Sequence, residues 1–292
     1  MTDRAPANQV LLGDCLEILP GLPDAGFGLV YLDPPFNTGR EQSMARMTTT
    51  RSAGGDRTGF QGRRYRTTLG DRQSFGDSFD DYTAWLEPRL QEAHRLLADN
   101  GTLYFHVDYR EVHYCKVLLD AIFGRQNFLN EVIWAYDYGG RSRRRWPTKH
   151  DNILVYVKDR DRYVFNHDAL DRIPYMAPGL VTREKAARGK TPTDTWWQTV
   201  VPTNGAERTG YPTQKPLAIL TRIVLASSRP GDTVLDFFAG SGTTGVAAAQ
   251  EGRSFVLVDN SPEAVRITCA RLRRLGIPYQ ATGPGVVKES DP

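Results

Sequence analysis

With 292 residues, 40% of them hydrophobic, the chain can bury a full core in one large domain or two small ones, and its net charge of +3 does not by itself indicate nucleic acid. No apolar stretch is long enough to span a membrane and residues 1–9 lack the apolar core of a signal peptide, so we expect a cytoplasmic protein without a membrane partner. Three scattered cysteines without CxxC spacing indicate buried thiols and exclude a disulfide framework or a zinc site.

The predicted strand at residues 27–32 ends in an acid, two prolines and an aromatic residue: Asp33, Pro34, Pro35 and Phe36. The prolines restrict the backbone, so the Asp33 carboxylate, a proline carbonyl and the Phe36 ring are held rigidly together. Two acceptors beside a stacking surface suit a planar ring that carries an NH2 group. The alternative is an ordinary strand exit with an Asp-Pro turn.

Residues 37–76 are predicted to lack regular structure. Gly, Ser, Thr and Arg dominate this insert, apolar periodicity is almost absent, and eight arginines stand against three acids. An insert of this length beside a candidate active site is typical of a functional loop, which we expect to become ordered over the substrate. Arg63, Arg64 and Arg66 are its candidate phosphate contacts. The alternative is a solvated loop without a specific partner.

Helices and strands alternate through the remainder of the first half of the chain. The apolar pattern predicts strands at 10–12, 102–108, 132–136 and 153–157, and helices at 15–19, at 80–97 with a kink at Pro88, and up to Phe123. Residues 159–210 have mixed charge and weak periodicity. We expect them to form an inserted subdomain or an extended loop.

A basic segment joins the last two of these strands. It consists of arginines interleaved with glycine and one tryptophan, with a lysine close behind: Arg141, Arg143, Arg144, Arg145, Trp146 and Lys149. This composition favours a loop that grips phosphates and stacks on a base. The alternative is a solubilising hairpin tip.

The last third of the chain returns to regular alternation. Strands are predicted at 233–236 and 254–258, and helices from 217, up to Gly252, and at 262–275. A loop with the pattern GxGxxG, residues 240–245, follows the first of these strands, and Asp259 follows the second. This order of strand, loop, helix, strand and acid is typical of a nucleoside site in an α/β sheet. The tail at 277–292 is predicted to be disordered.

Three ligands compete for the glycine-rich loop. An ATPase P-loop would need Gly-Lys-Ser/Thr, which is absent here. NAD would fit the glycines, but Asp236 would have no role beside its pyrophosphate. S-adenosylmethionine has no phosphate and carries an ammonium and a sulfonium, so acids around its pocket are favourable. Asp14, Asp33, Asp236 and Asp259 each end a predicted strand, although any one of them alone could be a helix cap or turn residue.

On these motifs the chain resembles the DNA amino-methyltransferases, which methylate exocyclic amines of DNA bases. Residues 33–36 are similar to the family's catalytic (Asp/Asn/Ser)-Pro-Pro-(Tyr/Phe) motif, and residues 236–243 to its cofactor loop, with Phe237 where the family mostly has Pro. Residues 211–216 resemble the segment that helps to seat the methionine end, and Gly13-Asp14 and Asp259 match positions that contact adenine and ribose. The catalytic motif precedes the cofactor loop, which is the order of the β group, a circular permutation.

The resemblance implies a Rossmann-like, doubly wound and mostly parallel sheet of the class I methyltransferase type. Residues 8–158 would be the catalytic half with its basic loop at 37–76, residues 159–210 an inserted target-recognition region, and residues 211–276 the cofactor half. The implied cofactor is S-adenosylmethionine, and its candidate contacts are Asp14, Asp33, Lys215, Asp236, Phe238, Ala239, Gly240, Ser241, Gly242, Thr243 and Asp259.

The implied reaction moves a methyl group to the exocyclic amine of a base flipped out of double-stranded DNA. Asp33 and the Pro34 carbonyl would accept the amine hydrogens and Phe36 would stack on the base, without a catalytic cysteine or a metal. Adenine N6 is favoured and cytosine N4 is the alternative. An RNA or protein-amide methyltransferase and a non-catalytic nucleic-acid binder stay open. A homodimer, a restriction endonuclease of the same system and a location at the nucleoid are further expectations.

Overall fold

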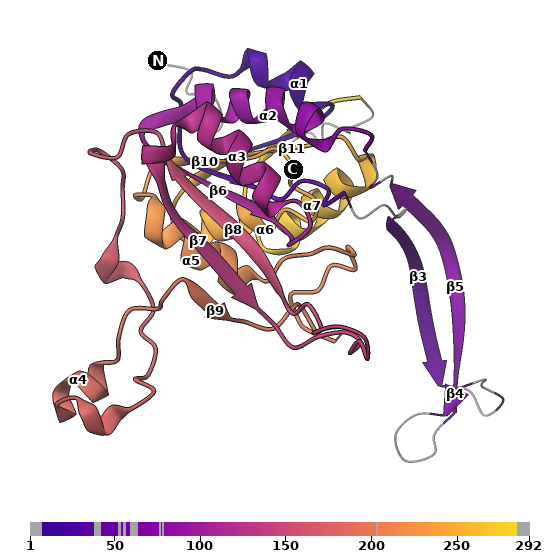
Figure 1. Cartoon of the computed structure of the whole chain (residues 1–292). Coiled ribbons are helices and arrows are strands. Elements are labelled where there is room, and N and C mark those ends of the chain that lie inside the picture. Colours follow the sequence, from indigo (N-terminus) through magenta and orange to yellow (C-terminus); the bar gives the residue numbers. More distant parts are fainter. Residues whose placement is uncertain are drawn as a thin grey trace.

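One mixed β-sheet forms the centre of the structure. The computed structural model describes residues 8–37, 42–51, 54, 57–58, 64–75, 77, 79–202 and 204–284, without the side chains of 42–51, 57–58 and 65–75. Within these residues the sheet has nine strands (Figure 1). In spatial order they are β12 (Gln280–Thr282), β1 (Asn8–Leu12), β11 (Ser254–Asp259), β10 (Thr233–Asp236), β2 (Phe27–Leu32), β6 (Leu97–Val107), β8 (His150–Val157), β7 (Phe128–Ala135) and β9 (Thr195–Trp197).

Five neighbouring strands, β1, β11, β10, β2 and β6, run parallel to one another. Their C-terminal ends therefore meet at one edge of the sheet, which we call the carboxyl edge. Strand β8 runs antiparallel to β6 and β7, so it begins at the carboxyl edge and ends at the opposite, amino edge. The predicted mostly parallel sheet is confirmed, and it brings the acid-tipped strands side by side.

Helices cover both faces of the sheet (Figure 1). On one face lie α1 (Cys15–Ile18), α2 (Tyr82–Leu96) and α3 (Val112–Phe123), and on the other α5 (Leu217–Ser227), α6 (Thr243–Gln250) and α7 (Pro262–Arg274). Strand β2 contributes to both cores, since Val30 and Leu32 pack on the first and Leu29 and Tyr31 on the second. All three cysteines are buried, as predicted. None of the helices described is both long and apolar enough to cross a membrane.

The insert at residues 37–76, which was predicted to lack regular structure, contains a β-hairpin. Its strands are β3 (Gln42–Arg51), β4 (Arg57–Thr58) and β5 (Arg64–Phe75), with β5 antiparallel to both others. Figure 1 shows this second sheet projecting from the first. The prediction was wrong because it relied on apolar alternation, which marks a strand only where one face packs on a core. β-branched threonines favour strands without that pattern, and Thr48 stands opposite Thr68 in the hairpin.

The C-terminal segment, predicted to be disordered, adds a strand to the sheet. β12 pairs in parallel with β1, and Asn8 Nδ2 donates a hydrogen bond of 2.8 Å to the carbonyl oxygen of Pro278. Ile277 and Tyr279 pack against the core. Three residues cannot hold a strand by themselves, so the open edge of β1 decides this structure, and no local pattern reveals it. Residues 285–292 of the predicted tail lie outside the described residues.

Residues 159–210, predicted for target recognition, begin at the amino edge, on the opposite side from the acids. The Asn166 amide donates to the Ala226 carbonyl at 2.7 Å there. The chain then forms α4 (Arg183–Arg188), which Figure 1 shows far from the hairpin. It returns to the carboxyl edge only through β9, which is parallel to β7. This position does not favour target recognition by residues 159–194, and for residues 198–210 the role stays a prediction.

Removal of β12 should destabilise the protein. A chain that ends at Gly276 loses the pairing with β1 and the packing of Ile277 and Tyr279, so its free energy of unfolding should fall by about 1–3 kcal/mol. A chain that ends at Pro284 keeps these contacts and is the matched reference. Urea denaturation followed by circular dichroism compares the two, and equal midpoints would show that β12 contributes nothing.

Candidate active site

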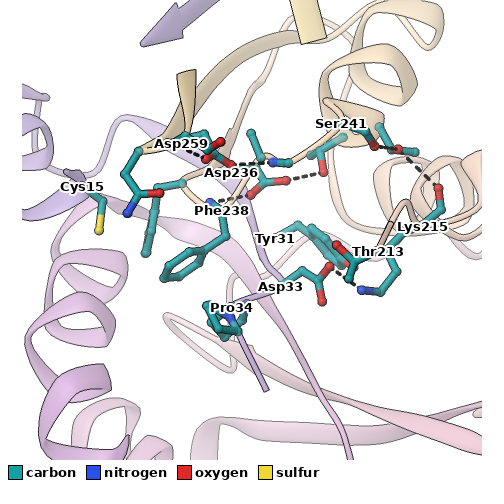
Figure 2. Close-up of a pocket in the computed structure, with 18 of the residues that line it drawn as sticks. Cys15, Tyr31, Asp33, Pro34, Thr213, Lys215, Asp236, Phe238, Ser241 and Asp259 are labelled. Atoms are coloured by element: carbon teal, nitrogen blue, oxygen red, sulfur yellow. Dashed lines mark hydrogen bonds and ion pairs between the residues drawn. The ribbon is translucent and has the colours of Figure 1, made fainter. Parts of the chain in front are cut away.

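Four acids from four neighbouring strands surround one cavity at the carboxyl edge. Asp14 follows β1, Asp33 follows β2, and Asp236 and Asp259 end β10 and β11. All four line a cavity of about 230 Å³, and Figure 2 shows three of them with their hydrogen bonds. The other predicted site residues that line it are Pro34, Pro35, Phe36, Lys215, Phe238, Ala239, Gly240, Ser241 and Thr243. Gly242 is not among its lining residues.

Four backbone N–H groups of the glycine-rich loop already donate hydrogen bonds within the protein. The N–H groups of Phe238 and Gly240 donate to the carboxylates of Asp236 and Asp259, at 3.0 and 2.7 Å. The N–H groups of Ala239 and Gly242 donate to backbone carbonyls. A pyrophosphate at such a loop would need free amides, so this geometry disfavours a dinucleotide.

The buried Asp236 carboxyl holds this loop in place through hydrogen bonds. It is 2% exposed, and its second oxygen accepts a hydrogen bond of 2.6 Å from Thr244 Oγ1. Burial raises the pKa of Asp236 to about 7, although its hydrogen bonds act in the opposite direction. Burial also raises the pKa of Asp259, whose oxygens accept from the Gly240 and Ser261 amides. Each carboxylate oxygen has a second lone pair, so Asp259 can still accept from a ligand.

Two loop positions require glycine because neighbouring side chains lie close to the backbone. Gly240 has a φ of +50°, and a side-chain carbon there would lie 3.0 Å from the Tyr211 ring. Gly242 has a φ of +70°, and a side-chain carbon would lie 2.6 Å from Thr268. The glycines thus allow the backbone to turn and its protein neighbours to approach.

Arg271 also holds the loop, and sequence reasoning missed it. This arginine is 4% exposed and donates to the Ser241 carbonyl at 3.2 Å and to Thr243 Oγ1 at 2.8 Å. It belongs to α7, where its position predicts only an ordinary charged helix residue. The contact becomes visible only when α7 packs beside the loop.

The Asp33 carboxylate is paired on one side and open on the other. Its Oδ2 forms an ion pair with Lys215 Nζ, which lies 5.0 Å from the centre of the Phe36 ring. Its Oδ1 is buried and accepts no hydrogen bond from any described residue, and His106 Nδ1 is 3.9 Å away. Lys215, predicted to contact the cofactor, therefore also contacts the catalytic motif (Figure 2).

The two proline carbonyls differ in availability. Tyr82 Oη donates a hydrogen bond of 2.7 Å to the Pro35 carbonyl. No described residue donates a hydrogen bond to the Pro34 carbonyl, and its role as an acceptor stays a prediction. The Phe36 ring lies beside the ring of His106, with 5.7 Å between the two ring centres.

An aromatic wall lines the cavity near Asp14, formed by Phe238, a predicted site residue, and by Trp85 of α2, which sequence reasoning missed. The Trp85 ring lies 5.9 Å from the Phe238 ring, and the Arg89 guanidinium lies 4.1 Å from the centre of Trp85. Arg89 also approaches Asp14, at 3.8 Å. Flat rings beside an acid suit a heteroaromatic ligand with a polar edge.

The basic segment starts and ends at the same edge of the sheet as Asp33, because it joins β7 to β8. Arg143, Arg144 and Trp146 are exposed, whereas Arg141 pairs with Asp137 at 2.9 Å and Arg145 approaches the Tyr109 hydroxyl at 3.4 Å. The Lys149 ammonium donates to the carbonyls of Gly139 and Gly140, so it holds the loop together. In the hairpin, Arg64 is exposed, and Arg63 and the Arg66 side chain lie outside the described part.

The chain is similar to known proteins over most of its length. A family model described as DNA methylase (N6_N4_Mtase) matches residues 27–270. The DNA adenine methyltransferase YhdJ of Escherichia coli (strain K12) is 28% identical over 274 residues, which cover 91% of this chain and 83% of that protein.

Two solved structures share the fold. The M1.HpyAVI–SAM complex has a TM-score of 0.58 and 21% identity and covers 90% of this chain and 98% of its own. The cytosine-N4-specific PvuII DNA methyltransferase has a TM-score of 0.61 and 15% identity, with 92% and 89% covered. The family model extends over both the Asp33 motif and the glycine-rich loop. The chain therefore belongs to the DNA methylase family.

Proposed function

We propose that this DNA methylase transfers a methyl group from S-adenosylmethionine to N6 of an adenine flipped out of duplex DNA. The observation that carries the proposal is Asp33 Oδ1, a buried carboxylate oxygen at the cavity that accepts no hydrogen bond from any described residue. Such an acceptor is costly in free energy unless a ligand donates to it.

An exocyclic amine supplies the donors that this site lacks. One N–H can donate to Asp33 Oδ1 and the other to the Pro34 carbonyl, while Phe36 stacks on the base ring. Both acceptors draw the nitrogen away from planarity, so its lone pair becomes available for attack. Lys215 fixes the other Asp33 oxygen, which sets the direction of Oδ1. Bound S-adenosylmethionine would supply the methyl group, and its sulfur would keep the electron pair of the broken C–S bond as the N–C bond forms. The Asp33 carboxylate, which accepts the amine N–H, would take the proton that the nitrogen releases.

The remainder of the cavity fits S-adenosylmethionine, which supplies a methyl group on a positively charged sulfur. Trp85 and Phe238 offer faces for an adenine ring, and Asp14 and Asp259 have lone pairs for polar groups of the nucleoside. The clustered carboxylates favour a cation, and the internally bonded loop amides favour a ligand without phosphates. Lys215 and the loop from Phe238 to Thr243 complete the set of proposed contacts.

Adenine is favoured over cytosine as the base. The Escherichia coli relative is named an adenine methyltransferase, and this chain has Asp at the first motif position. The PvuII enzyme, which is cytosine-N4-specific, shares the fold at 15% identity, so cytosine N4 remains the alternative. Both bases present an amine to the same acceptors by the same mechanism.

The basic segment is the proposed contact to the DNA backbone. It lies at the edge of the sheet that carries Asp33, and Arg143 and Arg144 are exposed there. Arg64 in the hairpin is a second candidate, and Lys149 is a weaker one because the loop carbonyls already bind its ammonium. A homodimer, a cognate restriction endonuclease and a location at the cytoplasmic nucleoid stay predictions.

Mass spectrometry of methylated DNA tests the base. The enzyme is incubated with duplex DNA and isotope-labelled S-adenosylmethionine, and the DNA is digested to nucleosides. We expect the label in N6-methyladenine. Label in N4-methylcytosine would establish the alternative, and label only in an RNA or protein substrate would contradict the proposal.

Replacement of the acceptor should separate methyl transfer from cofactor binding. We expect Asp33→Ala to lower the single-turnover rate by at least about 100-fold, because the amine loses its buried acceptor. The affinity for S-adenosylmethionine, measured by calorimetry, should change by less than about threefold. Asp259→Ala is the contrasting variant and should weaken cofactor binding. Loss of comparable cofactor affinity in Asp33→Ala would count against the assignment.

The salt dependence of DNA binding tests the basic segment. If Arg143 and Arg144 each neutralise a phosphate, the double variant to Gln should reduce the slope of log K against log salt by about 1.8. The matched control is Arg183→Gln with Arg188→Gln, which makes the same charge change on α4. An equal effect of both double variants would show that only net charge matters.

A further inference from the structure

A fully buried histidine lies behind the proposed amine acceptor. His106, near the end of β6, is 0% exposed, and three polar groups surround its ring. Tyr31 Oη is 2.8 Å from Nδ1, and Asp151 Oδ2 is 3.3 Å from Nε2. Asp33 Oδ1 is 3.9 Å from Nδ1, which is beyond hydrogen-bond distance. These residues come from β2, β6 and β8, and no sequence motif joins them.

The partners of His106 determine where its proton lies. Burial alone would raise the pKa of Asp151, but hydrogen bonds from His106 and Tyr136 hold it below the ordinary value, so Asp151 is a carboxylate at neutral pH. A carboxylate can only accept, so Nε2 carries the hydrogen. Burial raises the pKa of Tyr31, so its hydroxyl keeps its proton and donates to Nδ1. With its hydrogen on Nε2, His106 has a hydrogen-bond partner at both ring nitrogens.

This arrangement leaves Asp33 Oδ1 without a donor. Nδ1 has no hydrogen to offer it, and the Lys215 ammonium is paired with Oδ2. If the hydrogen stood on Nδ1 instead, the Tyr31 hydroxyl 2.8 Å away would accept it, and its positive charge near Asp33 Oδ1, which is 3.9 Å from Nδ1, would weaken that oxygen as an acceptor for the amine. We propose that Asp151 and Tyr31 are positioning residues that keep His106 in its Nε2–H form, so that Asp33 Oδ1 stays open for the base amine.

The groups that surround the His106 ring are Tyr31, Asp33, Phe36, Trp134 and Asp151, with Tyr136 and Lys215 acting on Asp151.

Nitrogen-15 spectroscopy of histidine-labelled protein tests the tautomer without any substrate. The chain has five histidines, and the signals of His106 are those absent from a His106→Asn spectrum. We expect a protonated Nε2 and an unprotonated Nδ1 in the natural protein. In Asp151→Asn the amide can donate to Nε2, so the hydrogen should move to Nδ1. A protonated Nδ1 in the natural protein at neutral pH would overturn the proposal.

Single-turnover kinetics test the consequence, which rests on the proposed role of Asp33. Asp151→Asn should lower the single-turnover rate about 100-fold, with cofactor affinity unchanged. A merely structural role would leave the His106 tautomer in place, and a full rate in a variant whose hydrogen has moved to Nδ1 would overturn the proposal. If the tautomer is as expected but Asp33→Ala retains activity, the proposed function fails and the tautomer assignment stands.

Tyr31→Phe provides a second, milder variant in case Asp151→Asn does not fold. Loss of the hydroxyl leaves Nδ1 without its donor, so the ring can carry its hydrogen there and the single-turnover rate should fall about 10-fold. The matched control is Tyr104→Phe, which removes another buried hydroxyl, 2.8 Å from Ser227 Oγ and outside the His106 network. Equal single-turnover rates in the two tyrosine variants would contradict a positioning role for Tyr31.

Discussion

The parallel alignment of β1, β11, β10 and β2 is the constraint on which the site depends. Parallel strands must all end at the same edge, so an acid placed after each strand brings four carboxylates to one cavity. Repulsion between them is relieved in different ways. Asp33 is paired with Lys215, and Asp259 accepts hydrogen bonds from backbone amides. Burial raises the pKa of Asp236, so this carboxyl carries less negative charge. The fold itself therefore makes the cavity favourable for a cationic ligand.

The same acids explain why a GxGxxG loop belongs here to a methylase. In a dinucleotide site the loop amides are free for a pyrophosphate, whereas here the amides of Phe238 and Gly240 are taken by Asp236 and Asp259. The carboxylates hold the loop in shape and also favour a cationic ligand. A glycine pattern that is ambiguous by itself becomes specific once its hydrogen-bond partners are known.

The two halves of the chain meet at Asp33. Lys215 reaches it from 182 residues further along the chain, and His106 and Asp151 stand behind it. The basic segment lies at this same edge, while residues 159–194 begin at the opposite one. The proposed catalytic residues and DNA contacts therefore lie at the carboxyl edge of the sheet. The reaction assigns no role to residues 159–194.

The sequence by itself determined the strands of the main sheet other than β9 and β12, the Asp33 motif and the glycine-rich loop, because each has a local signature in spacing or turn chemistry. Tertiary structure decided the rest. β12 depends on the open edge of β1, and Arg271 on the packing of α7. His106 depends on partners 75 and 45 residues away, Tyr31 and Asp151. Contacts between distant segments leave no periodic pattern in a single chain, so only folding reveals that these residues share one site.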